Sequence, residues 1–203
     1  MSTKTLFTER RSVNFFDPSK PISKELLSDI IDLAVNAPSA FNLQPWEIIA
    51  VTSEEAKKKM FDAAFSQPKI LEAPVTLIIV ADYEGYAGTN PEWDVMKAMM
   101  GEEATNGYIG FAANLYGSTP ERKIKFAESN AGLLSMSIIY AAESYGVKSH
   151  AMSGLDFDAI KKAFNLGENK EVVMAITLGY FDEEKQLYPR RSRRGFDEIV
   201  TTV

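Results

Sequence analysis

The arginines are the residues of this sequence whose type and spacing point most directly to chemistry. The chain has 203 residues and seven arginines, and all of these except Arg122 lie near its two ends. Arg10 and Arg11 are near the start, and the others lie between residues 190 and 194. A planar guanidinium group can bind phosphate oxygens through two parallel hydrogen bonds. Two interpretations are open: both ends are solvated, or both converge on one anion.

Polar residues also gather at several boundaries between apolar segments. The sequence APSAFNLQPW at 37–46 holds hydroxyl and amide side chains, two prolines and a tryptophan, more than a plain turn requires. Similar stretches lie at 9–16, 65–74, 152–158 and 189–200. Each is by itself compatible with an ordinary turn or helix cap. Together they offer arginines for a phosphate, hydroxyl and amide groups for a polyol and a ring edge, and proline and tryptophan for packing near a flat ring. These are the groups that flavin mononucleotide (FMN) needs.

Composition and missing motifs exclude several other kinds of site. The sequence has no cysteine and one histidine, which excludes thiol chemistry and zinc sites built on several histidines. We interpret His150 as structural. Neither G-x-G-x-x-G nor G-x-x-x-x-G-K-[ST] occurs, so no dedicated dinucleotide or P-loop site is expected. The net charge of −6 argues against nucleic-acid binding. The acidic runs at 92–94 and 182–184 are interpreted as solvated, so no metal site is predicted.

A framework of alternating helices and strands must position these residues. Helical spacing of apolar residues predicts helices, and continuous apolar runs predict strands covered on both faces. The class is therefore α/β or α+β, with helices on both faces of a sheet. The helix at 126–146 is apolar nearly all round, so it must be buried in a core or against another subunit. The predicted helices are 23–36, 53–65, 92–116, 126–146 and 155–167; the predicted strands are 46–52, 73–82, 147–152 and 171–180; a loop is predicted at 83–91 and a break at 117–123.

The whole chain, residues 1–203, is expected to form one domain. Its composition, 45% hydrophobic and 25% charged, is typical of globular proteins. No apolar run is long enough to cross a membrane, and the first residues lack the apolar region of a secretory signal. We therefore expect no membrane association and a cytoplasmic location.

With these segments in view, the sequence resembles the family of FMN-dependent nitroreductases. The opening RRSVNFFDPSKPISKELLSDIIDLAVNAPSAFNLQPWEIIAV is similar to the opening of that family, with an R-x-S element and the block A-P-S-x-x-N-x-Q-P-W before a strand. EAPVTLIIVAD, AESYGVKSHAMSGLDFDAIKKAFNL and the ending ITLGY…RRSRRGFDEIV follow in the family's order. The resemblance covers about 10–82 and 128–200, and 83–127 matches least.

The resemblance implies binding roles for particular residues but no catalytic side chain. The arginines would hold the FMN phosphate, and Ser12 would lie at the phosphate and ribityl end. The APSAFN block would contact the flavin of the other subunit. Gln67, or its neighbour Ser66, would reach the ribityl chain or ring edge, and the backbone N–H groups of Ser153 and Gly154 would face the ring edge near N5. The implied cofactor-binding residues are Arg10, Arg11, Ser12, Asn14, Pro38, Ser39, Ala40, Asn42, Gln67, Ser153, Gly154, Arg191 and Arg193.

The family resemblance also implies a fold and an assembly. The expected fold is an α+β sandwich with a central antiparallel sheet flanked by helices. The expected assembly is an intertwined homodimer with FMN at its interface. The tail at 181–203 would dock on the partner subunit, and the variable segment at 83–127 would cover the substrate pocket.

The implied activity is that of a flavin oxidoreductase. NAD(P)H would be a transient co-substrate that passes hydride to flavin N5, and a small-molecule acceptor such as a nitroaromatic or quinone would then take the electrons by a ping-pong mechanism. Related flavin chemistry is an alternative: free-flavin reduction, dehalogenation or oxygen-dependent flavin fragmentation. A flavin-binding sensor with little turnover is a second alternative, and a nucleic-acid or protein adaptor with an arginine-rich tail is a third.

Two positions depart from the family pattern. A basic residue is common two positions after the serine of R-x-S, and here that residue is Asn14. A cation beside the pyrimidine edge stabilises anionic reduced flavin, so the reduction potential should be lower unless another cation substitutes. An acidic residue is common where Ser153 stands. Because the backbone would do the binding there, that change matters less.

Overall fold

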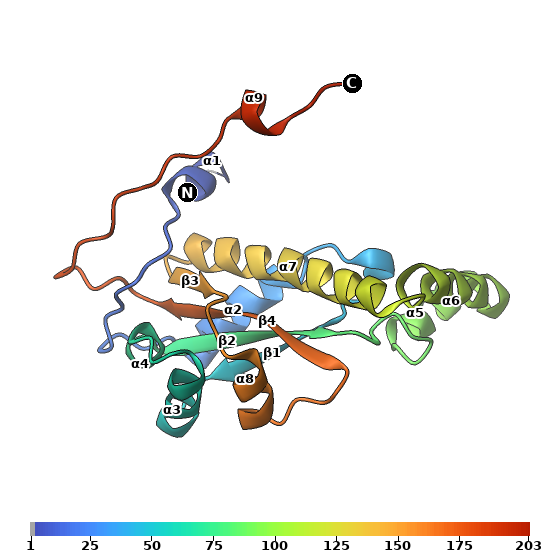
Figure 1. Ribbon diagram of the computed structural model, residues 1–203, viewed down its shortest axis with the longest axis horizontal. Coiled ribbons are helices and arrows are strands. Elements are labelled where there is room, and N and C mark those ends of the chain that lie inside the picture. Colours follow the sequence, from blue (N-terminus) through green and yellow to red (C-terminus); the bar gives the residue numbers. More distant parts are fainter. Residues whose placement is uncertain (1–2) are drawn as a thin grey trace.

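A computed structural model of the protein describes residues 3–203 (Figure 1). Its centre is an antiparallel sheet of four strands in the order β1-β2-β4-β3. This confirms the predicted α+β class with a central antiparallel sheet. The strands are β1 (Trp46–Val51), β2 (Val75–Asp82), β3 (Lys148–Met152) and β4 (Lys170–Gly179).

The central strand β2 is buried on both faces, as its continuous apolar run predicts. Its side chains alternate between two separate cores, because successive residues of a strand point to opposite faces. Leu77 and Ile79 belong to the core on one face, and Ile78 and Val80 to the core on the other. Helices must therefore cover both faces of the sheet.

The helices do form two layers (Figure 1). On one face the long α7 packs against β2 and β4, and α2 packs on α7 and adds residues to the same core; on the other, α3 and α8 contribute buried residues such as Met60 and Ile160. The pair α5–α6 projects beyond the sheet (Figure 1). The bounds of these helices and of the short α4 are α2 (Lys24–Ala34), α3 (Glu54–Ala63), α4 (Lys69–Glu72), α5 (Glu92–Met100), α6 (Glu102–Tyr116), α7 (Pro120–Ser144) and α8 (Phe157–Ala163).

Two helix boundaries differ from the sequence prediction. The segment 92–116 is divided into α5 and α6 at Gly101, whose φ of 88° is favourable only for glycine. The long helix begins at Pro120 rather than at 126, because the hydroxyl of Thr119 caps it and proline suits its first position. The predicted break at 117–123 is therefore only the short turn before α7.

The helix α1 (Thr3–Glu9) and the end of the C-terminal segment lie on the same side of the sheet, beyond α7 (Figure 1). The N-terminal helix α1, which was not predicted from the sequence, packs on α7 through Phe7 and Tyr140, whose ring centroids are 4.4 Å apart. The C-terminal segment, here called the arm (residues 181–203), passes α1 and carries the short helix α9 (Phe196–Ile199). Within residues 3–203, none of the helices could span a membrane.

Candidate functional site

The first candidate segment, residues 10–14, runs along the edge of the sheet. Ser12 forms a parallel bridge with Ser149 of the edge strand β3, and the N–H of Val13 donates to the carbonyl of Ser149 at 3.0 Å. His150 Nδ1 lies 3.0 Å from the carbonyl oxygen of Val13. Because that oxygen can only accept, Nδ1 carries the proton. The segment is thereby fixed, and the side chain of Ser12 stays exposed.

Arginines from the arm meet this segment. Arg190 donates to the carbonyl oxygens of Glu9 and Arg10 at 3.2 and 3.3 Å, and Arg11 donates to the carbonyl of Tyr188. The segments enclose a cavity of about 180 Å³, here called the arginine cavity. It is lined by Arg10, Arg11, Ser12, Tyr188, Pro189, Arg190, Arg191 and Arg193.

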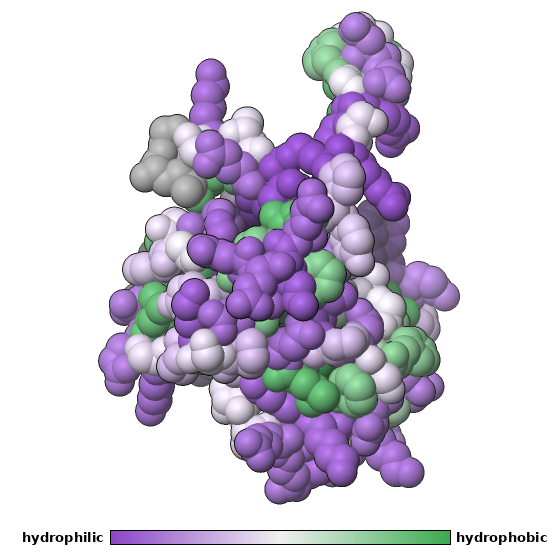
Figure 2. Space-filling view, turned by 90° about the vertical axis from the view of Figure 1, so that its left-hand side faces the viewer, coloured by the Kyte–Doolittle hydropathy of each residue, from purple (hydrophilic) through white to green (hydrophobic). Residues whose placement is uncertain are grey.

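The arginine cavity carries uncompensated positive charge. Among residues 3–203, none of the lining arginines forms an ion pair with a carboxylate; their hydrogen bonds go to backbone carbonyls. Figure 2 shows this end of the molecule, with the hydrophilic arm rising from the body and hydrophobic residues near its tip. Clustered guanidinium groups repel one another unless an anion binds between them. The geometry therefore favours the interpretation in which both ends converge on one anion.

A second group lies past the other end of β3. The side-chain amide of Gln67 donates to the carbonyl of Gly154 at 2.9 Å, and Lys69 Nζ is 3.3 Å from Gln67 Oε1. Ser153 and Gly154 are exposed, and their backbone N–H groups have no acceptor among the described residues. Two unused N–H donors next to each other can serve a ring edge that accepts hydrogen bonds.

Lys69 connects this group to the first segment. Burial, and to a lesser extent the charge of Lys69, lower the pKa of His150 to about 4. His150 is therefore neutral at physiological pH and supports the Val13 carbonyl, in agreement with a structural role. The pKa of Lys69 is itself lowered by burial, an effect that the charge of Glu72 partly offsets.

The third candidate segment, Pro38–Asn42, forms a turn that ends in the 3₁₀ helix η1 (Ala40–Asn42). The hydroxyl of Ser39 accepts from the N–H of Gln44 at 3.0 Å, and the N–H of Ala40 donates to Asn130 of α7 at 2.9 Å. The amide of Asn42 donates to Glu92 at 2.9 Å. Pro38 is exposed. This segment, here called the wall, is therefore attached to α7 and α5.

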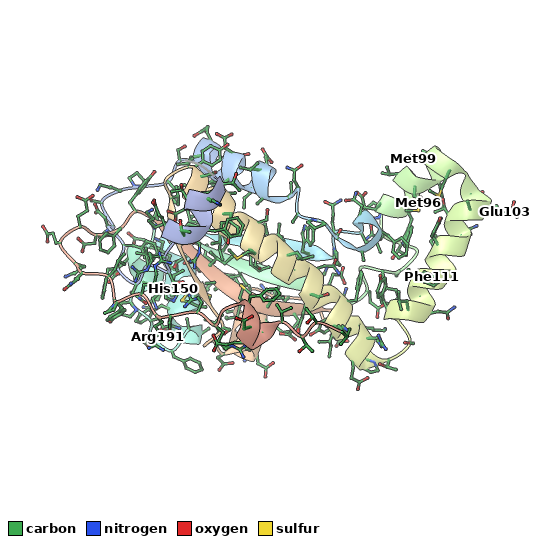
Figure 3. The ribbon with its side chains drawn as sticks, turned by 90° about the horizontal axis from the view of Figure 1, so that it is seen from above. Met96, Met99, Glu103, Phe111, His150 and Arg191 are labelled. Atoms are coloured by element: carbon green, nitrogen blue, oxygen red, sulfur yellow. The ribbon has the colours of Figure 1, made fainter. Side chains whose placement is uncertain are left out.

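The single chain does not bring the wall to the arginine cavity. In Figures 1 and 3 the wall lies well along α7 towards α5–α6, whereas residues 10–14 and the arm lie at the opposite end, where His150 and Arg191 are labelled. The predicted site residues thus fall into three sets. Arg10, Arg11, Ser12, Arg191 and Arg193 line the arginine cavity, with Asn14 farther along the same segment; Gln67, Ser153 and Gly154 lie past β3; and Pro38, Ser39, Ala40 and Asn42 form the wall.

Backbone strain marks two of the candidate segments. Among residues 3–203, six non-glycine residues have positive φ. Phe41 and Asn42 lie in the wall, Gln44 follows it, and Phe65 and Ser66 precede Gln67. Such conformations cost about 1–3 kcal/mol each and cluster at functional sites. Phe41 at φ 52° places its ring among Trp93, Tyr108, Phe111 and Tyr116, with centroids 5.7–6.4 Å away.

Three residues of these groups were not predicted from the sequence. Tyr188 and Arg190 line the arginine cavity, and Arg190 also joins the arm to residues 9–10. Lys69 stands two residues after Gln67 in the stretch already singled out, so its proximity was a usable signal. No group of three His, Asp or Glu side chains within residues 3–203 is arranged to hold a metal ion.

Comparison with known proteins identifies the family of this chain. The sequence profile of the nitroreductase family matches residues 7–180. The NADH dehydrogenase of Thermus thermophilus is 31% identical over 186 residues, which are 91% of this chain and 89% of that protein. The crystal structure of ydfN from Bacillus subtilis superposes with a TM-score of 0.92 at 28% identity, covering 98% of both chains. A crystal structure from Exiguobacterium sibiricum, determined in complex with FMN, has a TM-score of 0.86 at 25% identity and covers 99% of this chain and 97% of its own.

Proposed function

The chain belongs to the nitroreductase family, and from this premise we propose that it is an FMN-dependent oxidoreductase. Its electron donor is NADH or NADPH, and its acceptor is a nitroaromatic or quinone-type compound. The observation that carries the proposal is the arginine cavity, where arginines from both chain ends meet without a carboxylate partner. The names of relatives, an NADH dehydrogenase and an FMN complex among them, support the same conclusion.

The residues around the arginine cavity fit the phosphate end of FMN. Arg10, Arg11, Arg191 and Arg193 would supply charge-assisted hydrogen bonds to a dianionic phosphate. The exposed hydroxyl of Ser12 would bind at the same end. The edge position of the segment on β3 fixes these donors before the cofactor arrives, which reduces the entropy lost on binding.

The group past β3 fits the ring edge. Gln67 holds the carbonyl of Gly154, which orients the neighbouring peptide groups and leaves the N–H groups of Ser153 and Gly154 for the flavin. Lys69 would supply the cation that Asn14 cannot. A cation beside the pyrimidine edge favours the anionic reduced flavin, so Lys69 would offset the lower potential expected from Asn14.

The wall would complete the site of the partner subunit in a homodimer. In the single chain the wall lies along α7 towards α5–α6, away from the arginine cavity (Figures 1 and 3), so we assign Pro38, Ser39, Ala40 and Asn42 to the cofactor of the partner subunit. The arm supports this arrangement, because it leaves the body with Phe196 and Ile199 about two-thirds exposed. The arm would dock on the partner, and 83–127 would cover the substrate pocket.

Bound FMN would supply hydride transfer at its N5 atom, first from the nicotinamide and then to the acceptor on the same face. The chain's own residues bind and orient: the arginines hold the phosphate, the N–H groups of Ser153 and Gly154 hold the ring edge, and the wall closes the pocket. No side chain is assigned as a catalytic acid or base. This division leaves the redox chemistry to the cofactor and placement and electrostatics to the protein.

The direct test is a spectroscopic titration of the purified protein. We expect a protein-bound flavin spectrum that bleaches when NADH or NADPH is added without oxygen and returns when a nitroaromatic or quinone is added. Absence of FMN binding would refute the proposal. Bound FMN that neither nicotinamide reduces would instead favour a flavin sensor.

A further inference from the structure

A separate cavity lies between the end of α6, the beginning of α7 and the wall. Its volume is about 260 Å³, and its lining includes Ala40, Tyr116, Arg122, Lys125, Phe126 and Asn130. Of these residues, only Ala40 is among the predicted cofactor-binding residues. Arg122 is the one arginine outside the two terminal clusters, and none of the sites described so far uses it.

The floor of this cavity is aromatic. The rings of Tyr116 and Phe126 stack with centroids 4.4 Å apart and an interplanar angle of 27°. Phe126 is buried, and burial raises the pKa of Tyr116, so its hydroxyl remains protonated and able to donate. Asn130 is held by two hydrogen bonds, from the N–H of Ala40 and to the carbonyl of Phe126, which fix the wall against the floor. A flat apolar surface of this kind favours a planar ring.

The rim of the cavity is cationic. Within residues 3–203, Arg122 and Lys125 have no carboxylate within ion-pair distance, although the chain carries a net charge of −6. Lys123, between them in sequence, is paired with Glu84 at 2.5 Å and lies over the ring of Tyr86. Arg122 stands in the first turn of α7, where the helix dipole favours acidic rather than basic side chains. Two unpaired cations next to an aromatic floor are complementary to an anionic group on a ring.

We propose that this cavity binds a small aromatic carboxylate, with the ring against Tyr116, which the buried Phe126 supports, and the carboxylate at Arg122 and Lys125. Its volume is just below the ~300–1,000 Å³ range of pockets for drug-sized ligands, which fits one substituted ring and not a dinucleotide. Ala40 would face the partner's flavin, so the bound carboxylate would be the electron acceptor. That last assignment depends on the proposed function, whereas binding itself does not.

Calorimetric titration of the purified full-length protein tests the binding. The probes are 4-nitrobenzoate and the neutral 4-nitrobenzamide, which differ mainly in charge. We expect the carboxylate to bind about tenfold more tightly, since a hydrogen bond to a charged group contributes more than a neutral one. Variants R122Q and K125Q, and above all their combination, should remove this preference and leave the affinity for the amide nearly unchanged.

The matched control is Lys123→Gln, which removes a positive charge from the same turn of α7 but not from the cavity lining. The preference for the carboxylate should survive in this variant. Equal affinities of the two probes for the unaltered protein would overturn the proposal. A preference for the carboxylate that persists in the double variant would also overturn it. The same holds if Lys123→Gln abolishes the preference as completely as the double variant does.

Steady-state kinetics separates the acceptor from the nicotinamide donor. In the double variant the KM for 4-nitrobenzoate should rise about tenfold, and the KM values for NADH, NADPH and 4-nitrobenzamide should stay close to those of the unaltered enzyme. A rise confined to the KM for NADPH would assign the cations to the donor's phosphate and overturn the acceptor assignment. If the protein fails to bind FMN, the proposed function falls while the calorimetric result still decides the carboxylate site.

Discussion

At the scale of single residues, the arginine cavity combines groups that are about 180 residues apart in sequence. Arg190 reaches the carbonyls of Glu9 and Arg10, so the arm and the first segment are held together before any anion arrives. Hydrogen bonds to backbone carbonyls orient the guanidinium groups without neutralising them. The cavity is therefore preorganised for an anion.

Replacing an arginine of this cavity should weaken FMN binding. We expect Arg10→Ala and Arg193→Ala each to lower the affinity about tenfold, because each removes a charge-assisted hydrogen bond in a partly exposed site. Quenching of flavin fluorescence measures the affinity. Arg194→Ala is the matched control, since Arg194 belongs to the same cluster in sequence but does not line the cavity. Loss of affinity only in the control would disprove the assignment.

His150 should make stability depend on pH. Its pKa is lowered to about 4, mainly by burial, whereas the unfolded chain takes up that proton near the ordinary value of 6.5. The contribution of His150 to stability is therefore complete above about pH 6.5 and is lost as the pH falls towards about 4. Because the ring is partly exposed, we expect a loss of about 1 kcal/mol between about pH 7 and pH 5.

Urea unfolding at these two pH values, for the unaltered protein and for His150→Gln, measures this effect. The glutamine variant should be less stable at about pH 7, since the packing around the ring is lost, but it should show a smaller decrease on acidification. Equal decreases in the two proteins would show that other groups cause the pH dependence.

At the scale of elements, close packing of β4 against its neighbours depends on the absence of a side chain at Gly179. A Cβ atom there would lie 2.7 Å from Cδ1 of the buried Phe16 and 2.8 Å from Cδ of Pro74. These contacts are closer than van der Waals distance, and Phe16 belongs to the segment that leads from the arginine cavity into the sheet. The end of β4 therefore determines where that segment can lie.

Gly179→Ala should destabilise the protein by about 1–3 kcal/mol, since overpacking a filled core forces side chains and backbone to shift. Gly110→Ala in α6 is the opposite case, because a Cβ atom there would meet nothing within 4 Å beyond its own helix backbone, and alanine favours a helix. That variant should be unchanged or slightly more stable. Denaturant titration gives both free energies of unfolding, and a harmless Gly179→Ala would contradict the packing argument.

At the scale of the whole molecule, the end of the arm and one face of α7 carry exposed apolar side chains. Leu133 and Met136 on α7 are exposed, and so are Phe196 and Ile199 on α9. Exposed apolar residues on two separate elements are typical of a surface that another subunit covers. The separation of the wall from the arginine cavity also supports a homodimer. In the proposed dimer, the wall of one subunit would lie beside the arginine cavity of its partner.

Removing residues 195–203 should therefore weaken the homodimer while leaving every lining residue of the arginine cavity in place. Light scattering coupled to size-exclusion chromatography should show a dimer for the full chain and a concentration-dependent mixture for the truncated one. The double substitution F196S/I199S tests the same contact without shortening the chain. A monomeric full-length protein, or a truncated protein that dimerises equally well, would refute the proposed assembly.

The sequence predicted the framework better than the details of the site. All four strands and the helices at 24–34, 54–63 and 157–163 could be predicted, because their apolar spacing is read locally. The start of α7 at Pro120 was missed, although Thr119 and Pro120 are a recognisable cap and first residue. Lys69 was missed for a different reason: although its place two residues after Gln67 is visible in the sequence, its effect on His150 arises only when β3 and α4 meet.

By itself, the sequence determined the composition of the candidate site and the layers of the fold. The sequence itself contains the arginines at both ends and the wall segment, and it has no cysteine. The spacing of its apolar residues predicts helices and strands from local sequence alone. Only the tertiary structure decided which of these residues meet. It joined Arg190 to residues 9–10, placed Gln67 on Gly154 and separated the wall from both. The physical reason is that hydrogen bonds between distant segments depend on the packing of the sheet and its two helical layers, which no local pattern contains.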